Sequence, residues 1–215
     1  MNKILLALAL SVLVVSITGC ASISYKPAIS LGESPKTIKA KVKIDTFVDK
    51  TPADDKDAKV GGVSATAPGT LASSLDSEIT DAVLSDFNNN QLFLETKKRI
   101  ENPDLILKGN INRFYGKAGM NELAWVTLPL DILWLFGLPI QTDEGMVDIT
   151  MQLTKPDGTL VGEYNGKYEY LDTFSMYNNP VLNVPSRLNK AFSEAVKQIR
   201  EKILADDIKL TLGIK

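Results

Sequence analysis

Histidine is absent from this 215-residue chain, and cysteine occurs once, as Cys20. These two shortages exclude the nucleophile systems that depend on a histidine base, and they exclude the usual zinc ligand sets. Any catalyst would have to use carboxylates or a Ser-Lys pair. A calcium loop is disfavoured too, because Asp54, Asp55 and Asp57 lack the ligand spacing and the final glutamate of an EF-hand. Gly61 and Gly62 are not followed by the Gly-Lys-Ser/Thr of a phosphate loop. We therefore expect no metal and no cofactor.

Excess charge of either sign is also lacking. The whole chain has a net charge of −2, and without residues 1–19, which contain one lysine, the net charge is −3. Nucleic-acid binding usually needs a concentrated basic patch. We therefore expect no nucleic-acid partner.

The N-terminus has the pattern of an export signal. Lys3 precedes an apolar run over residues 4–15, which is too short to span a bilayer and suits a secretory signal. The run ends in Ile17-Thr18-Gly19-Cys20, with small residues before the only cysteine. We expect residues 1–19 to be a signal peptide and cleavage to fall between Gly19 and Cys20.

This ending resembles the lipobox of bacterial lipoproteins. The resemblance implies that the Cys20 thiol is diacylated and that the new N-terminus receives a third acyl chain. More than one chain is needed, since a single acyl chain binds membranes only marginally. Ala21 stands where an aspartate would retain the protein in the inner membrane. The resemblance thus implies an outer-membrane lipoprotein that faces the periplasm, with the inner membrane and the cell surface left open.

The rest of the chain predicts a tether and one domain. Residues 20–36 are rich in serine, glycine and proline and are interpreted as a tether. Alternating apolar residues predict a strand from residue 37, and a strand pair joined by the turn Lys155-Pro-Asp-Gly158. Helical spacing predicts two amphipathic helices, one capped by Thr70 and one over residues 186–205. Residues 37–215 are therefore expected to form a single α+β domain of two layers, with a mixed, mostly antiparallel sheet and both helices on one face.

Further strands and a long loop complete the expected order. We expect strands over residues 92–95, 105–115, 146–153 and 160–171, and a last edge strand over residues 208–214. Residues 49–69 are polar and rich in helix and strand breakers, which is typical of a functional or solvated loop.

Part of this pattern resembles the CsgG-like domain of envelope lipoproteins. The residues that carry the resemblance are 42–49, Gly61 and Gly62, the helix from Leu71, residues 92–95 and 103–111. The resemblance covers residues 37–114 and implies a non-enzymatic component that assembles in rings or docks with partners. The amphipathic membrane hairpins of CsgG itself have no counterpart here, so a pore is not expected.

An apolar insert over residues 119–142 departs from this pattern. Its stretch 123–142 holds both tryptophans and one charge, Asp131. Pro129, Pro139 and that charge disfavour a membrane-spanning helix. Three interpretations remain open: a buried loop over the sheet, insertion at the membrane surface, and contact with a protein partner or a second copy. The residues expected to make such a contact are Trp125, Leu130, Trp134 and Phe136.

These patterns favour a lipid-anchored, non-enzymatic assembly or binding component in secretion or envelope maintenance. Residues 49–69 are a second candidate surface. One alternative is a periplasmic carrier of an apolar ligand or lipid, with the insert as a lid. Another is a carboxylate-based hydrolase of envelope polymers, for which the candidate acids are Asp104, Asp131, Asp148 and Glu163.

Overall fold

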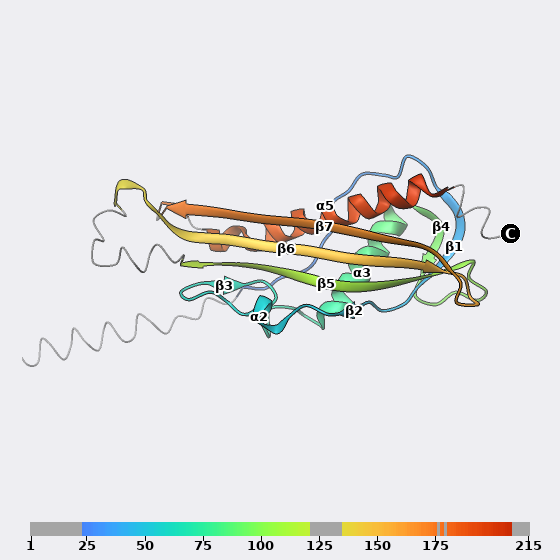
Figure 1. Cartoon of the computed structure of the whole chain (residues 1–215), viewed down its shortest axis with the longest axis horizontal. Coiled ribbons are helices and arrows are strands. Elements are labelled where there is room, and N and C mark those ends of the chain that lie inside the picture. The colour runs from blue at the N-terminus through green and yellow to red at the C-terminus, as the bar shows by residue number, and fades with distance from the viewer. Residues whose placement is uncertain (1–22, 121–134, 176, 179, 208–215) are drawn as a thin grey trace, which may run out of the picture.

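A computed structural model of the chain describes residues 23–120, 135–175, 177–178 and 180–207. Its elements are β1 (Ile38–Ile44), β2 (Val48–Asp49), α2 (Ala53–Lys56), β3 (Val63–Ser64), α3 (Leu75–Asn89), β4 (Phe93–Lys97), β5 (Leu105–Met120), β6 (Pro139–Thr154), β7 (Leu160–Ser175), a 3-10 helix η2 (Pro180–Asn183) and α5 (Val184–Ala205). The seven strands form one mixed sheet in the order β4-β1-β5-β6-β7, with β2 and β3 paired to β5. The helices α3 and α5 cover one face of the sheet (Figure 1). The predicted α+β class is confirmed.

Three long antiparallel strands dominate the sheet. The strands β5, β6 and β7 have 16 residues each, which corresponds to about 50 Å at about 3.3 Å per residue. The 22 residues of α5 extend over only about 33 Å at 1.5 Å per residue. The far ends of the long strands, where β5 ends and β6 begins, therefore extend beyond the helices (Figure 1). We call this part the distal end of the sheet.

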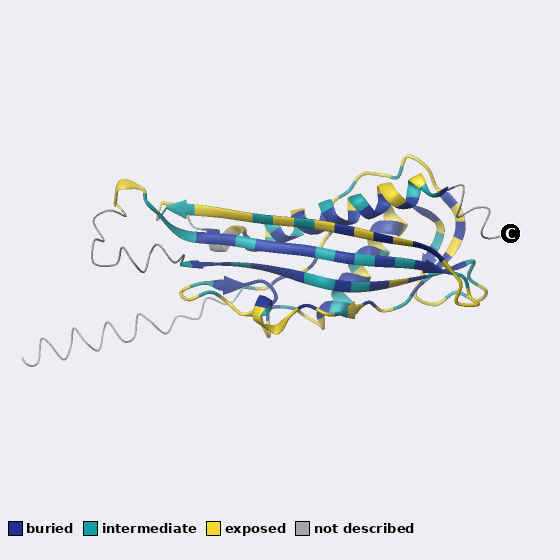
Figure 2. Ribbon diagram, viewed as in Figure 1, coloured by how far each residue is buried: buried dark blue, intermediate teal, exposed yellow. Residues whose placement is uncertain are grey.

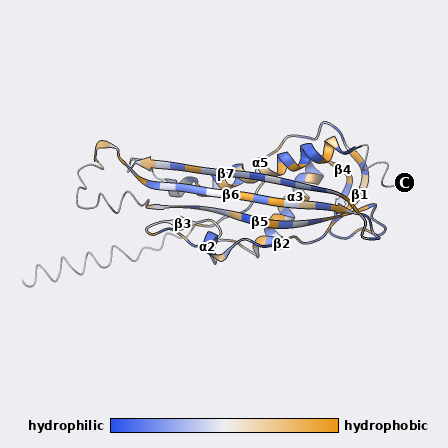
Figure 3. Ribbon diagram, in the orientation of Figure 1, coloured by the Kyte–Doolittle hydropathy of each residue, from blue (hydrophilic) through white to orange (hydrophobic). Residues whose placement is uncertain are grey.

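The core lies under the helices and not at the distal end. Buried residues of the two helices recur at the predicted spacing, and they are Leu75, Ile79, Val83 and Phe87 on α3 and Leu188, Phe192, Ala195, Val196, Ile199 and Ile203 on α5. Phe192 packs edge to face on Phe114 of β5, with ring centroids 5.3 Å apart, a favourable geometry for aromatic pairs. Hydrophobic residues therefore concentrate in the half of β6 under the helices, whereas its distal half is hydrophilic (Figure 3).

The first long helix begins later than the sequence predicted. The residue at its N-cap position is Ser74 and not Thr70. The Thr70 hydroxyl is engaged elsewhere, since it donates to the backbone carbonyls of Ala65 at 2.6 Å and Ala67 at 2.7 Å. A threonine that satisfies loop carbonyls in this way stabilises the turn before the helix instead of capping the helix itself.

The described part of the expected tether, residues 23–36, lies against the domain. Tyr25 is only 2% exposed, its hydroxyl donates to Asn189 Oδ1 at 2.9 Å, and its ring lies 6.4 Å from that of Phe114. Further along, the backbone N–H of Ser30 donates to Ser193 Oγ, and Arg200 donates to the carbonyl of Gly32. We call residues 23–35 the N-terminal segment. Its composition resembled a linker because its polar groups bond to the helices instead of forming a helix or strand of their own.

The polar stretch 49–69 is also held to the sheet. It contains the last residue of β2 together with α2 and β3, and Asp55 of α2 accepts two hydrogen bonds of 2.7 Å from Arg113 of β5. A Cβ on Gly62 would lie 1.9 Å from the carbonyl oxygen of Ala118, so only glycine permits this close approach. The strand expected over residues 208–214 lies outside the described residues.

Candidate interaction surface

Exposed apolar side chains gather at the distal end of the sheet, just before β6 and just after β7. Leu135 is 59% exposed, Phe136 is 81% exposed and Tyr177 is 65% exposed. The Tyr177 hydroxyl donates to the carbonyl of Leu135 at 2.7 Å, so the two segments lie side by side. We call these three residues the tip. Large side chains held in water by a fixed backbone are typical of a contact surface.

Of the four predicted contact residues, the structure describes one. Phe136 is the most exposed large apolar side chain of the described part of the chain. Trp125, Leu130 and Trp134 lie outside the described residues, as do Gly19 and Cys20. The predicted insert 119–142 is shorter than expected, because β5 continues to Met120 and β6 begins at Pro139.

Below the tip, Arg187 at the start of α5 connects the helix to two strands. Its guanidinium lies 3.3 Å from Asp143 Oδ2 on β6 and also pairs with Asp172 on β7. The same group lies over the ring of Tyr170 at 4.7 Å and that of Phe174 at 5.7 Å. A planar cation can stack on aromatic faces while it binds carboxylates at its edge. Arg187 therefore holds the distal half of the β6–β7 pair to the helix layer.

Asp143 has an unusual environment for a carboxylate. It is fully buried, and neither of its oxygens accepts a hydrogen bond from the described residues. Burial raises the pKa of Asp143 to about 6, the Arg187 charge lowers it, and nearby Glu144 raises it further. Burial and the charge of Asp143 also raise the pKa of Tyr170. Arg187 is thus the main group that compensates this buried charge.

On the face of the sheet opposite the helices, charged side chains hold residues 49–69 to β5 and β6. Tyr115 lies between two cations, with Arg113 at 5.1 Å and Lys117 at 5.2 Å from its ring. Lys59 forms an ion pair of 2.9 Å with Glu144. Within the described residues, no three acidic, cysteine or histidine side chains converge as metal ligands. Because Asp55 binds Arg113, the acidic cluster at residues 54–57 helps to hold α2 on the sheet.

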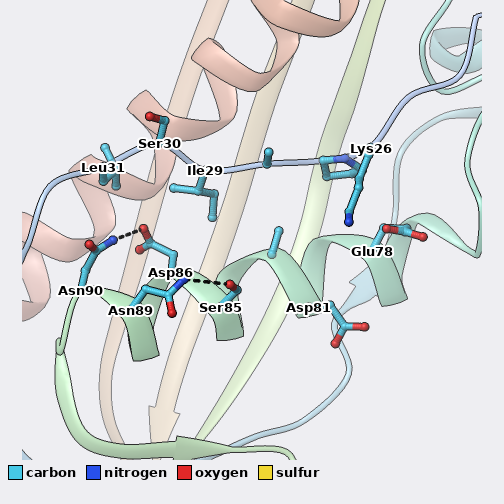
Figure 4. A pocket seen from close by; sticks show the side chains of 13 residues that line it. Lys26, Ile29, Ser30, Leu31, Glu78, Asp81, Ser85, Asp86, Asn89 and Asn90 are labelled. Carbon is cyan, nitrogen blue, oxygen red and sulfur yellow. Dashed lines mark hydrogen bonds between the residues drawn. The ribbon is translucent and has the colours of Figure 1, made fainter.

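A cavity of about 490 Å³ lies between the N-terminal segment and α3 (Figure 4). Three acids, Glu78, Asp81 and Asp86, contribute to its lining together with Lys26 and other polar groups. Asp86 is 4% exposed, accepts a hydrogen bond of 2.6 Å from Asn90 and lies 3.5 Å from Arg200 on α5. Burial raises the pKa of Asp86, while Arg200 and Asn90 lower it. Apolar residues also line this cavity, namely Pro27, Ala28, Ile29, Leu31 and Ala82, so its lining is mixed.

The candidate catalytic acids do not form a pair in the described structure. Asp104 accepts a hydrogen bond from the backbone N–H of Lys41, whereas Asp148 accepts from Asn112 and Asn165. Glu163 pairs with Gln152 of β6, four residues from Asp148 along that strand, which corresponds to roughly 13 Å. Glycosidases place their carboxylates at most about 9.5 Å apart. Asp131 lies outside the described residues.

Comparisons with known proteins give likeness of shape alone. No protein-family model matches the chain, and no curated protein matches it either. Among solved structures, a Xanthomonas campestris protein of family DUF330 aligns with a TM-score of 0.49 and 11% identity over 86% of this chain and 95% of that one. A Caulobacter crescentus protein described as a candidate lipoprotein aligns with a TM-score of 0.27 and 15% identity over 52% and 73%. Within the described residues, no helix has the length and apolar character to cross a bilayer.

Proposed function

We propose that this chain is a lipid-anchored envelope lipoprotein that acts as a non-enzymatic assembly or binding component in secretion or envelope maintenance. Lipid on Cys20 holds it at the outer membrane, facing the periplasm. The tip makes the contact with an envelope protein or with a second copy. The exposed apolar tip, displayed beyond the helices, is the observation that carries this proposal.

The docked N-terminal segment supports a close attachment to the membrane. Only two residues, Ala21 and Ser22, lie between Cys20 and Ile23, and the three residue steps from Cys20 to Ile23 span at most about 11 Å. From Tyr25 onward the chain is bonded to the helices. A lipidated Cys20 would therefore hold the domain near the bilayer instead of on a long flexible linker.

The direction of that segment relates the anchor to the tip. Tyr25 contacts Asn189 near the start of α5, and Gly32 contacts Arg200 near its end. The start of α5 is also where Arg187 holds the distal strands. The anchor thus leaves the domain on the side of the distal end, which favours partners in or beside the membrane as the targets of the tip.

Lipidation gives the first testable expectation. The protein isolated from its native cells should begin at Cys20 and have the mass of that chain plus three acyl chains. The variant Cys20→Ser should leave the membrane fraction, because stable anchoring requires the added lipid. Ser22→Ala, two residues away, is the matched control and should stay in the membrane fraction. A native protein that retains Met1 and has an unmodified thiol would contradict the proposal.

Contact through the tip gives the second expectation. A photoreactive amino acid at Phe136 should cross-link to a protein when cells are irradiated, and the product should have a defined mass. Leu94 on β4 is the control, since it is 63% exposed but lies on the edge strand at the other side of the sheet. Equal cross-linking at both positions would contradict a specific contact. If adducts form only with phospholipid, the tip contacts the membrane surface and not a protein partner.

A further inference from the structure

The last strand, β7, is an edge strand, and its odd-numbered residues direct their backbone groups away from β6. At Lys167, both the N–H and the carbonyl bond to the Gln198 side chain of α5, at 3.1 and 2.9 Å. Lys202 of α5 donates to the carbonyl of Asn165 at 2.6 Å. Because the backbone of an edge strand alternates direction with every residue, the same outward direction applies to Glu169, Leu171 and Thr173.

Among the described residues, coverage of this edge ends at Lys167. No hydrogen bond from a described residue reaches the outward backbone groups of residues 169, 171 and 173. We call residues 169–173 the open edge. In Figure 1 the helix α5 rises above β7 only along its proximal part, and Figure 2 shows exposed residues along the distal part.

The open edge has two acids, Glu169 and Asp172, but lacks several other protections that natural edge strands use. Residues 168–175 contain no proline and no lysine, and the pairing of β7 with β6 is regular over residues 168–173. Leu171 is 66% exposed in its middle. A long unprotected edge with an apolar centre is a template for pairing with another strand. By contrast, side chains of α5 bond to the outward backbone groups of Asn165 and Lys167 on the same strand.

We propose that the open edge pairs with the open edge of a second copy, as antiparallel strands related by a two-fold axis at Leu171. This inference names one partner of the proposed function but places the contact away from the tip, so its failure would leave the tip and the lipid anchor untouched. The interface is isologous: each surface meets its own copy. The two exposed Leu171 side chains then cover each other.

Charge and coverage select this register. With the axis at Leu171, Glu169 faces Thr173, and each facing outward pair exchanges two backbone hydrogen bonds. An axis at Glu169 or Asp172 would place like charges opposite each other, which destabilises a strand pair. An axis at Tyr170 would need the backbone of Lys167, which Gln198 already occupies. Of these four axes, only the one at Leu171 pairs residues 169, 171 and 173 without placing like charges opposite each other and without the backbone that Gln198 occupies.

The test is the mass of the full chain in density-matched detergent by analytical ultracentrifugation. The chain should be dimeric at micromolar concentration, and Leu171→Lys should weaken the dimer at least tenfold, since the two ammonium groups would face each other. Leu160→Lys is the matched control, because Leu160 is 55% exposed on the same strand but lies outside the open edge; it should leave the dimer unchanged. Leu171→Pro should act like Leu171→Lys, because it removes only an outward N–H and spares the pairing with β6.

Cross-linking tests the register itself. In the full chain with Cys20→Ser, Leu171→Cys should form an intermolecular disulfide, since facing residues of such a pair have Cα atoms about 5.5 Å apart, within disulfide range. Leu160→Cys should not. A chain that sediments as a monomer at every concentration overturns the proposal, and so does a dimer that resists both Leu171→Lys and Leu171→Pro. A dimer that these variants dissolve but that Leu171→Cys fails to cross-link overturns the register.

Discussion

Replacing Arg187 with methionine is expected to lower the free energy of unfolding by about 3 kcal/mol at pH 8. Removal of one partner from a buried ion pair costs about 3–5 kcal/mol, because the remaining charge has no compensation. Here the remaining charge is Asp143, which is fully buried and accepts no hydrogen bond from the described residues. We use the lower figure because Arg187 itself is 24% exposed.

The stability that Arg187→Met loses should be smaller at pH 5 than at pH 8, because the pKa of Asp143 is raised. In the folded protein this pKa is about 6 instead of about 3.8, so the folded state binds a proton more readily than the unfolded state. The contribution of Asp143 to stability therefore falls as the pH rises from about 4 to 6 and is constant above. Without Arg187 the folded pKa is higher still, so the decline continues beyond pH 6. At pH 5 the carboxyl is mostly neutral in both proteins, and the missing cation matters less.

Urea unfolding of both proteins at pH 5 and pH 8 measures this difference. Lys190→Met is the matched control on the exposed side of α5 and should change stability little at either pH. Asp143→Asn together with Arg187→Met should remove most of the pH dependence of the loss. An equal loss at both pH values would show that Arg187 stabilises the fold through stacking on Tyr170 and Phe174 and not through Asp143.

The parts of the fold under the helices were predictable because burial leaves a regular pattern there. In β1, the apolar residues alternate with lysines, and the structure buries the former and exposes the latter. In α5, the predicted apolar stripe is the buried face. In both cases one side of the element meets the core and the other meets water, so periodicity alone predicts the type of element.

The distal end was not predictable in the same way. The far halves of β5 and β6 read Gly-Lys-Ala-Gly-Met and Gln-Thr-Asp-Glu-Gly, without apolar alternation. Their inner face packs on Arg187 and not on an apolar core, so Asp143 occupies a position where the pattern predicts an apolar residue. The ionic contact depends on residues 44 positions apart, and no local spacing indicates it.

The two candidate contact surfaces, the tip and the open edge, also differ in how far the sequence indicates them. Phe136 was one of the contact residues expected from the sequence, although a buried loop stayed open as an alternative, and the structure shows its side chain 81% exposed. The open edge was not, because it depends on where α5 lies along β7. Only the contacts of Gln198 and Lys202 show that coverage ends at Lys167. Likewise, the docking of residues 23–35 depends on Asn189, Ser193 and Arg200, far away in the sequence.

The helix α5 approaches β7 closely at Gly166, and Gly166→Ala is expected to cost about 3 kcal/mol of stability. A Cβ at this position would lie 2.0 Å from the backbone carbonyl oxygen of Ala195 and 2.9 Å from Ile199. Overpacking usually costs about 1–3 kcal/mol, and we expect the upper end because the clash is with helix backbone, which cannot rotate away. Thermal unfolding measures the loss. Gly32→Ala is the control, since a Cβ there meets no atom within 4 Å.

The same substitution connects the packing of the helix to the exposure of the sheet edge. If the helix must move away from Gly166, then Gln198 and Lys202 leave the backbone of residues 165–167, and the unprotected edge extends from residues 169–173 to include residues 165–167. Folded Gly166→Ala protein should therefore form assemblies larger than the wild-type dimer, whereas Gly32→Ala should not. Adding Leu171→Lys to Gly166→Ala should reduce these assemblies only in part, because the newly uncovered residues lie outside the original open edge. Wild-type stability and wild-type size for Gly166→Ala would mean that the helix does not rest on this glycine, and that the edge is protected by something other than α5.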